Sequence, residues 1–335
     1  MTATTPESAP RPETLLQVQE LKLQFDTPRG ALRAIEGVSF EVAPGECVGI
    51  VGESGCGKSM TARAVMGLVP EPGKIKGGRV LFEGHDLLAL SPREWRKVRG
   101  RKVALVFQEA KRALDPTATV GSQIVEAIQL ARNVSRGTAE EEAQQALGLV
   151  GLPDAQRVMQ SYANELSGGM AQRVMIAIAI VGGAKLIIAD EPTSALDVSV
   201  QAQILKLLRD LRDRTQSSLV LITHDLGVAA ENCDRIVVMY AGQIVEEAPA
   251  QELFRNPGHP YTQRLLEALP TKGRGAPRPI AGSVPDLVSP PPGCRFVTRC
   301  PLAVPACSTV PAAIAIGPKH FVACVHASPD VTRPV

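Results

Sequence analysis

The stretch GESGCGKS, residues 52–59, places a lysine and a hydroxyl after a glycine-rich loop, with the spacing G-x-x-x-x-G-K-S. Glycines let backbone N–H groups turn toward an anion, the lysine reaches the terminal phosphates of a nucleotide, and the hydroxyl can ligate Mg²⁺. A glycine-rich turn without a ligand is the alternative, but an apolar run precedes the loop and a helical pattern follows it, which is the context the motif requires. The expected contact residues are Gly52, Glu53, Ser54, Gly55, Cys56, Gly57, Lys58, Ser59 and Met60.

The stretch LIIADE, residues 186–191, is an apolar run that ends in two acids. Functional side chains of parallel sheets gather at the carboxyl ends of strands. Asp190 is therefore a candidate to hold Mg²⁺, directly or through water, and Glu191 a candidate to polarise an attacking water. Taken alone, the two acids fit a solvated turn equally well, but beside a phosphate loop the chemical role is favoured.

A second candidate anion site is the stretch LSGGMAQRV, residues 166–174. Ser167 can cap a helix that begins here, and Gly168 and Gly169 allow close approach of backbone to a ligand. An ordinary capped helix is the structural alternative. One nucleotide does not obviously need two such sites in one chain, whereas two copies that face each other would use both.

These residues are joined by alternating strand and helix patterns. Apolar runs typical of buried strands alternate with segments of helical spacing, which predicts an α/β fold with a largely parallel sheet. The segment from about 110 to 180 lacks strand signals and is predicted to be a helical insert. The expected strands are 47–52, 103–108, 185–190, 219–223 and 235–239, and the expected helices include 122–131, 139–150 and 198–211.

The two ends of the chain have a different composition. Residues 1–14 contain three prolines and no apolar core, so we expect a disordered lead-in rather than a signal peptide. After about residue 255, proline and glycine recur every few residues, which predicts a loop-rich extension. No apolar run approaches the roughly 18 residues of a membrane span, and the net charge of +2 implies no polyanionic partner.

The four motifs GESGCGKS, LSGGMAQRV, LIIADEPTSALD (186–197) and LITHD (221–225) stand in the order found in the nucleotide-binding subunits of ABC transporters. The chain resembles that family over about residues 15–255. The resemblance implies a RecA-like P-loop NTPase core with an antiparallel β edge, and a head-to-tail dimer that holds two ATP molecules with Mg²⁺. Each ATP would lie between one subunit's phosphate loop and the other's LSGG stretch.

The resemblance also implies roles for single positions. Gln108 matches the glutamine that senses Mg²⁺ and the membrane partner, and His224 matches the histidine that contacts the γ-phosphate. Asp197 matches a loop that communicates across the dimer. Phe25 lies where the family places an aromatic ring against adenine, although a phenylalanine there could equally belong to the core.

The stretch NPGHPYTQRLLEALP, residues 256–270, and the tail over 256–335 resemble the C-terminal extension of oligopeptide/dipeptide importer ATPases, a group that includes nickel importers. This implies an ATPase that powers solute import from the cytoplasmic face of the membrane. The implied partners are a second ATP-binding subunit, with a related paralogue favoured over an identical copy, two permease subunits and an extracytoplasmic solute-binding protein, but no nucleic acid. The chain departs from the group at Ala110, Lys111 and Arg112, near the expected permease contact, and at Ala184.

Four of the seven cysteines fall in the tail, at Cys294, Cys300, Cys307 and Cys324. Their spacing, C-x5-C-x6-C-x16-C, matches neither the paired cysteines typical of structural zinc nor the usual ferredoxin run. The family resemblance implies a [4Fe–4S] cluster, while zinc or free thiols stay open as alternatives. His320 and His326 are possible substitute ligands, and we expect His259 to be structural.

Two functions of other classes remain as alternatives. One is a soluble ATPase of the same fold that acts on nucleic acid or ribosomes, although such proteins usually carry two cassettes or a long coiled coil. The other is a redox or iron sensor in which the cysteine tail regulates the ATPase. Co-purification with membrane proteins would argue against the nucleic-acid or ribosome ATPase. Comparison of the ATPase rates with an intact and with an oxidised tail would test the redox or iron sensor.

Overall fold

The larger of two sheets has a parallel centre made by the apolar runs of the sequence. In this computed structural model, which describes residues 14–194, 196–269 and 279–329, these strands stand in the order β9-β3-β8-β7-β6. Every residue of β3, β6, β7 and β8 is buried, which explains why these strands show no polar alternation. The strands are β9 (Arg235–Tyr240), β3 (Cys47–Val51), β8 (Ser218–Thr223), β7 (Leu186–Asp190) and β6 (Val103–Val106). The predicted α/β fold is confirmed.

Three antiparallel strands extend this sheet beyond β9, in the order β10, β12 and β11. They are β10 (Gln243–Pro249), β12 (His320–Val322) and β11 (Ile314–Gly317). The last two belong to the C-terminal extension, which the sequence analysis described only as loop-rich. Strands of three and four residues are too short to show an alternating pattern, so this hairpin had no visible signal.

The predicted antiparallel β edge forms a sheet of its own. Its strands pair in the order β2-β1-β4-β5, and its apolar side chains pack on the helix that follows the phosphate loop. The strands are β1 (Leu16–Thr27), β2 (Gly30–Val42), β4 (Gly73–Phe82) and β5 (His85–Asp86). The predicted lead-in over residues 1–14 lies outside the described residues except for Thr14.

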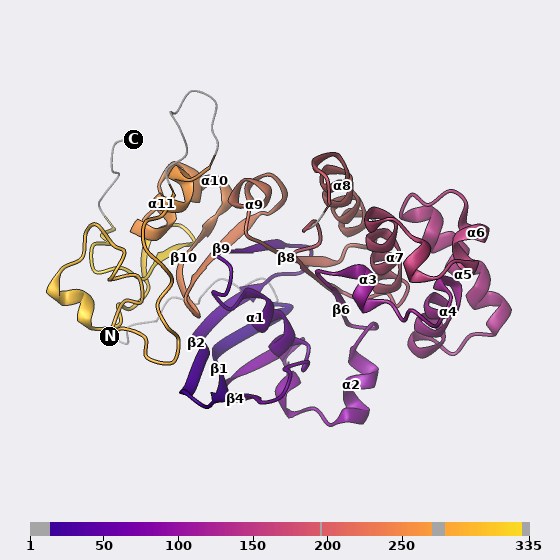
Figure 1. Cartoon of the computed structure of the whole chain (residues 1–335), viewed down its shortest axis with the longest axis horizontal. Helices are drawn as coiled ribbons and strands as arrows, with labels where there is room; N and C mark the ends of the chain where they lie inside the picture. Colours follow the sequence, from indigo (N-terminus) through magenta and orange to yellow (C-terminus); the bar gives the residue numbers. More distant parts are fainter. Residues whose placement is uncertain (1–13, 195, 270–278, 330–335) are drawn as a thin grey trace, which may run out of the picture.

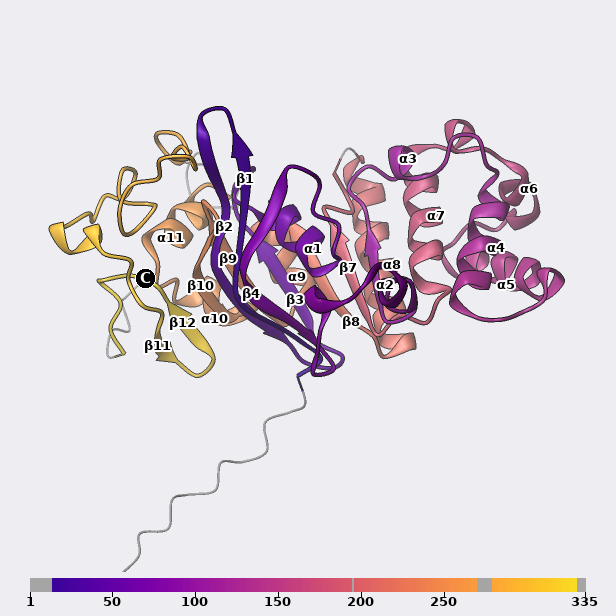
Figure 2. The same cartoon turned by 90° about the horizontal axis from the view of Figure 1, so that it is seen from below.

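One group of helices stands apart from the sheets (Figure 1). Figure 1 shows α4 to α7 at one end of the molecule and the C-terminal extension at the other, with the sheets between them, and Figure 2 shows the same separation from below. The helices are α1 (Lys58–Val65), α2 (Pro92–Val98), α3 (Ala110–Ala113), α4 (Val120–Ala131), α5 (Arg136–Leu149), α6 (Ala155–Gln160), α7 (Gly168–Ile180), α8 (Val198–Thr215), α9 (Leu226–Asn232), α10 (Ala250–Arg255) and α11 (Pro260–Glu267), with short 3₁₀ turns at Leu87–Ala89, Ala163–Glu165 and Pro305–Ser308. Among the described residues, no helix combines the length and apolarity needed to cross a membrane.

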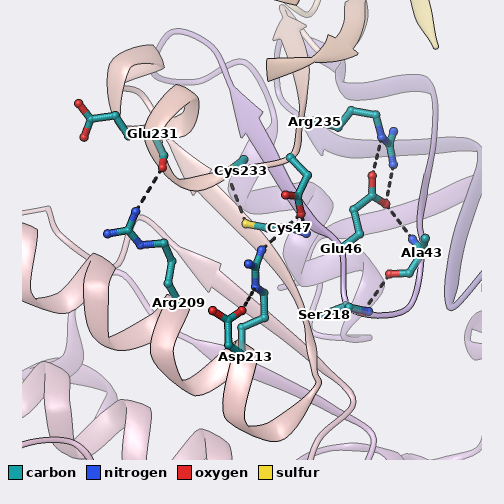
Figure 3. Close-up of polar contacts among 12 residues, drawn as sticks. Ala43, Glu46, Cys47, Arg209, Asp213, Ser218, Glu231, Cys233 and Arg235 are labelled. Carbon is teal, nitrogen blue, oxygen red and sulfur yellow. Dashed lines mark hydrogen bonds and ion pairs between the residues drawn. The ribbon is translucent and has the colours of Figure 1, made fainter. Parts of the chain in front are cut away.

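Polar contacts tie together the amino ends of the parallel strands, opposite the candidate site (Figure 3). Arg235 donates to the carboxylate of Glu46 at 2.8 Å, and the backbone N–H of Cys47 donates to Asp234 at 2.8 Å. The sulfurs of Cys47 and Cys233 lie 3.5 Å apart, and both residues are buried. These contacts fix β3 and β9 relative to each other, so the loops at their carboxyl ends begin at fixed positions.

The extension is docked on the larger sheet through a buried carboxylate. Glu246 of β10 accepts hydrogen bonds from the backbone N–H groups of Gly258 (2.7 Å) and His259 (2.8 Å), and it lies 2.7 Å from Nε2 of His320. Nearby, the rings of Tyr240, Tyr261 and Phe296 pack together with centroids 4.6–5.4 Å apart. The extension therefore shares a core with the cassette instead of folding around one of its own.

Candidate functional site

The phosphate loop leaves β3 and enters α1 in a conformation that only glycine adopts easily. Gly52, Gly55 and Gly57 have φ angles of 155°, 79° and 104°. A Cβ atom at Gly52 would lie 2.1 Å from the carbonyl oxygen of Met239, so the loop is also packed against the carboxyl end of β9. Nζ of Lys58 donates to the carbonyl oxygens of Gly52 (2.8 Å) and Glu53 (3.1 Å), which leaves it folded onto its own loop.

Ser59 and Asp190 meet beside this loop. The Ser59 hydroxyl, in the first turn of α1, donates to Oδ1 of Asp190, the last residue of β7, at 2.8 Å. Asp190 is 4% exposed, and burial raises the pKa of its carboxyl although the Ser59 hydrogen bond acts in the opposite direction. A hydroxyl and a buried carboxylate in contact are oxygen ligands of the kind that Mg²⁺ prefers, so these residues fit the predicted ion.

The carboxylate of Glu191 lies where three strands end. Its Oε2 accepts a hydrogen bond from Nε2 of Gln108 at 3.0 Å and lies 3.5 Å from Nδ1 of His224. The backbone of Glu191 has a φ of 45°, an uncommon conformation for a residue with a side chain, and its N–H donates to the carbonyl of Ile222 in β8. The Glu191 side chain is 15% exposed and that of His224 is 64% exposed, so the histidine can reach a ligand above the carboxylate.

One open cavity collects these groups. Of the residues predicted from the sequence, its lining includes Phe25, Ser54, Gly55, Gly57, Lys58, Ser59, Met60, Gln108, Glu191 and His224. Gly52, Glu53, Cys56 and Asp190 are not part of the lining, but they contact residues that are. Phe25 and other apolar residues that precede the phosphate loop in the sequence form one wall of this cavity. That arrangement suits a purine base next to a phosphate loop.

Several residues of this cavity were not predicted from the sequence, namely Thr27, Leu32, Ala34, Pro72 and Leu287. Leu287 belongs to the C-terminal extension, and its carbonyl accepts a hydrogen bond from the N–H of Arg33 in β2 at 2.9 Å. An aliphatic residue in a proline-rich segment carries no sequence signal for ligand binding. Only the tertiary contact with β2 reveals its position.

The second predicted anion site lies outside this cavity. Ser167 caps α7 by accepting from the N–H of Met170 at 3.2 Å, which confirms the predicted cap. Asp197 caps α8 in the same way, accepting from the N–H of Val200 at 3.0 Å. Neither these residues nor Gly168 and Gly169 line the cavity described above, so within this chain they have no part in it.

The four tail cysteines line a small cavity of about 10 Å³, together with His259 and His326. Burial raises the pKa of Cys294 to about 11 and also raises the pKa of Cys300. Among the described residues, no group of three or more His, Cys, Asp or Glu side chains is arranged so that it could hold a metal ion. The sequence brings the cysteines to one place, but not into a compact ligand set.

His259 forms part of the wall of this cavity. Its Nδ1 accepts from the N–H of Tyr261 at 2.9 Å, so in the neutral ring the proton is on Nε2. That Nε2 is buried and has no hydrogen-bond partner among the described residues. A buried N–H beside a cavity fits an acceptor bound in the cavity, such as a sulfide or thiolate.

Comparisons with known proteins agree with this geometry. Residues 35–194 match the model of the ABC transporter family, and residues 245–307 match the model described as "Oligopeptide/dipeptide transporter, C-terminal region". The chain is 47% identical to the "Probable peptide ABC transporter ATP-binding protein" of Sinorhizobium fredii, over 95% of this chain and 96% of that protein. It is 44% identical to the dipeptide transport ATP-binding protein of Bacillus subtilis, over 93% of this chain and 94% of that protein.

A similar solved structure is that of an ATP-binding cassette in a dimeric, post-hydrolysis state bound to ADP and phosphate. It has a TM-score of 0.64 and 27% sequence identity, and the match covers 70% of this chain and 98% of that one. The resemblance inferred from the motifs is confirmed. The chain belongs to the ATP-binding proteins of ABC transporters, in the group that carries the oligopeptide/dipeptide transporter C-terminal region.

Proposed function

We propose that this chain hydrolyses ATP to power the import of peptides, or of a related solute, through separate membrane subunits. The observation that carries the proposal is the convergence of Gln108 and His224 on the carboxylate of Glu191, in the cavity that the phosphate loop lines. The names of the relatives, which are peptide and dipeptide transport proteins, support peptides as the solute.

In this mechanism Lys58 leaves the carbonyl oxygens of Gly52 and Glu53 and binds the terminal phosphates of ATP. Ser59, Asp190 and Gln108 would hold Mg²⁺, which when bound would supply positive charge to balance the negative charge of the phosphates. Glu191 orients a water molecule in line with the γ-phosphate, and His224 contacts the phosphate from the open side of the cavity. Phe25 stacks on the adenine ring, with Met60 beside it.

Ser167, Gly168, Gly169 and Asp197 act on the nucleotide of a second ATP-binding subunit. Their position outside this chain's own cavity supports that role, because a head-to-tail partner would bring the start of α7 to the facing phosphate loop. A related solved cassette is dimeric. We propose that this second subunit is a paralogue of the chain. Sedimentation of the Glu191→Gln variant alone, with Mg²⁺ and ATP, tests this proposal. A stable homodimer in that experiment would contradict it.

The remaining partners are two permease subunits and an extracytoplasmic solute-binding protein, so the chain would sit on the cytoplasmic face of the membrane. The exposed side chain of Arg112 is a candidate permease contact, because it lies in α3, which begins directly after Glu109. Affinity purification of the tagged chain from solubilised membranes should recover integral membrane proteins. Recovery of ribosomes or nucleic acid instead would favour the alternative class of ATPase.

For the tail we propose a [4Fe–4S] cluster on Cys294, Cys300, Cys307 and Cys324. Two observations support it: the four side chains line one cavity, and His259 presents an N–H there without an acceptor. A single zinc ion gathers all its sulfur ligands within about 2.3 Å of one point, whereas each cysteine of a cluster binds a different iron. The lack of a compact ligand set among the described residues is therefore easier to reconcile with a cluster than with one zinc ion.

Metal analysis of protein purified without oxygen tests this assignment. About four iron and four sulfide per chain, lost when any one of the four cysteines is replaced by serine, are expected. A content of about one zinc per chain would show that the tail holds a structural zinc ion and not an iron–sulfur cluster. Protein without metal would leave the ATPase assignment unchanged and would remove the cluster from it.

A further inference from the structure

Glu53, the second residue of the phosphate loop, has all of its polar groups engaged. Its carbonyl accepts from Lys58, and its N–H donates to the hydroxyl of Tyr261 at 2.9 Å. Its carboxylate pairs with both terminal nitrogens of Arg299, at 2.6 and 3.1 Å. Tyr261 lies in α11 and Arg299 in the cysteine-bearing tail, so two of these three contacts come from the C-terminal extension.

Arg299 is held on all sides, unlike the surface ion pairs of this protein. Its side chain is 3% exposed, and Glu53 is 28% exposed. Nε donates to the carbonyl of Ala281 at 2.9 Å, and the guanidinium also contacts the hydroxyl of Tyr240 at 3.3 Å. A two-pronged arginine–carboxylate contact fixes orientation as well as distance, and a guanidinium locked by other partners loses little freedom on forming it.

A second chain of contacts runs from the same tail segment to the far end of the loop. Arg295 is buried and donates to the carbonyl of Ala241, in the turn between β9 and β10. The next residue in that turn, Gly242, donates its N–H to the carbonyl of Cys56 in the phosphate loop at 2.8 Å. Arg295 and Arg299 stand between Cys294 and Cys300, so one short segment lines the cysteine cavity, contacts the phosphate loop directly through Arg299, and supports it indirectly through the turn that Arg295 contacts.

We infer that the C-terminal extension is part of the nucleotide site, with Arg299 as a positioning residue that holds the phosphate loop through Glu53. This inference rests on the proposed ATPase function, because that function makes ATP the ligand of the phosphate loop. Arg299 acts in two ways. It fixes the backbone whose N–H groups must face the phosphates, and it neutralises a carboxylate that would otherwise repel them.

The test is a double-mutant cycle on the full chain, with the dissociation constant for ATP measured by isothermal titration in the presence of Mg²⁺. Arg299→Ala leaves the Glu53 carboxylate unpaired, so we expect ATP affinity to fall by about tenfold or more. Glu53→Gln combined with Arg299→Ala removes that charge, and we expect it to bind ATP more tightly than Arg299→Ala alone. Arg299→Lys, which keeps the charge but loses the two-pronged contact, should fall between wild type and Arg299→Ala.

Steady-state kinetics separate positioning from a general structural role. The loop is held in the same way before and during reaction, so Arg299→Ala should raise KM for ATP with kcat changed by less than about threefold. Arg264→Ala is the matched control, because Arg264 pairs with Glu267 in the same extension at 2.6 Å without contacting the loop. Iron content and thermal unfolding of each variant show whether the tail itself remains intact.

Unchanged ATP affinity in Arg299→Ala, or an equal loss with and without the Glu53 carboxylate, would overturn the inference. If Arg299→Ala does not fold, Tyr261→Phe tests the other contact between the extension and Glu53, since it removes only the hydroxyl that accepts from the Glu53 N–H. We expect it to weaken ATP binding severalfold, and wild-type affinity in this variant would also overturn the inference. Failure of the proposed function has a different signature: wild-type protein that binds no ATP, or Lys58→Ala that binds it normally.

Discussion

Replacing Glu246 by glutamine tests how the C-terminal extension is attached. The carboxylate of Glu246 is fully buried and takes three contacts of 2.7–2.8 Å, from Gly258, His259 and His320. A glutamine in the same place keeps one acceptor oxygen and turns an NH₂ group toward a donor. One backbone N–H is then buried without an acceptor, which costs about 1–3 kcal/mol, and the charge that strengthened the remaining bonds is lost.

We therefore expect local opening of this contact to become easier by about 2–3 kcal/mol, which is about 30- to 150-fold in hydrogen exchange at the amides of Gly258 and His259. Hydrogen exchange followed by mass spectrometry measures this on the intact chain. Glu247→Gln is the matched control, because Glu247 is the next residue of β10 but pairs with Arg235 instead. Exchange at 258 and 259 that rises less than about threefold in Glu246→Gln, or equally in both variants, would refute the reasoning.

Further predictions concern the nucleotide cavity and its neighbour. Lys58→Ala should abolish ATP binding, and titration calorimetry checks this. Glu191→Gln should still bind ATP but hydrolyse it at least about 100-fold more slowly, since it loses the group that polarises water; normal turnover in a phosphate-release assay would exclude the role. Leu287→Ala should weaken ATP binding severalfold, by removing apolar surface from the cavity wall. Burial lowers the pKa of His259 from 6.5 to about 3, so below about pH 6.5 the unfolded chain takes up a proton that the folded chain does not. The stability of metal-free protein should then fall by up to about 1.4 kcal/mol per pH unit between pH 6 and pH 4 from this group alone, and urea unfolding of His259→Asn should show a smaller slope.

Local patterns were sufficient to predict the catalytic side of the site. The phosphate loop, the acids after β7 and the histidine after β8 all lie at strand ends. In a parallel sheet those ends share one edge, so a correct strand assignment also brings Lys58, Asp190, Glu191 and His224 together. The contact between Gln108 and Glu191 follows from the neighbouring positions of β6 and β7.

The contribution of the extension could not be predicted in the same way. Arg299 and Leu287 lie in a proline-rich segment without periodicity, and their partners Glu53 and Arg33 are more than two hundred residues away in sequence. Such contacts depend on where the extension docks. The docking depends in turn on a buried carboxylate in β10 and on a hairpin whose strands, Ile314–Gly317 and His320–Val322, are too short to be recognised by pattern.

The central claim is that ATP hydrolysis at Glu191 drives solute import. Its most direct test is the ATPase rate of this chain reconstituted in proteoliposomes with its partner ATPase, its permease subunits and the solute-binding protein, with and without peptide. We expect the hydrolysis rate to rise when the binding protein carries peptide and to be lost in Glu191→Gln. An ATPase rate that does not change with peptide and binding protein, or that persists in Glu191→Gln, would contradict the proposed coupling of hydrolysis to import.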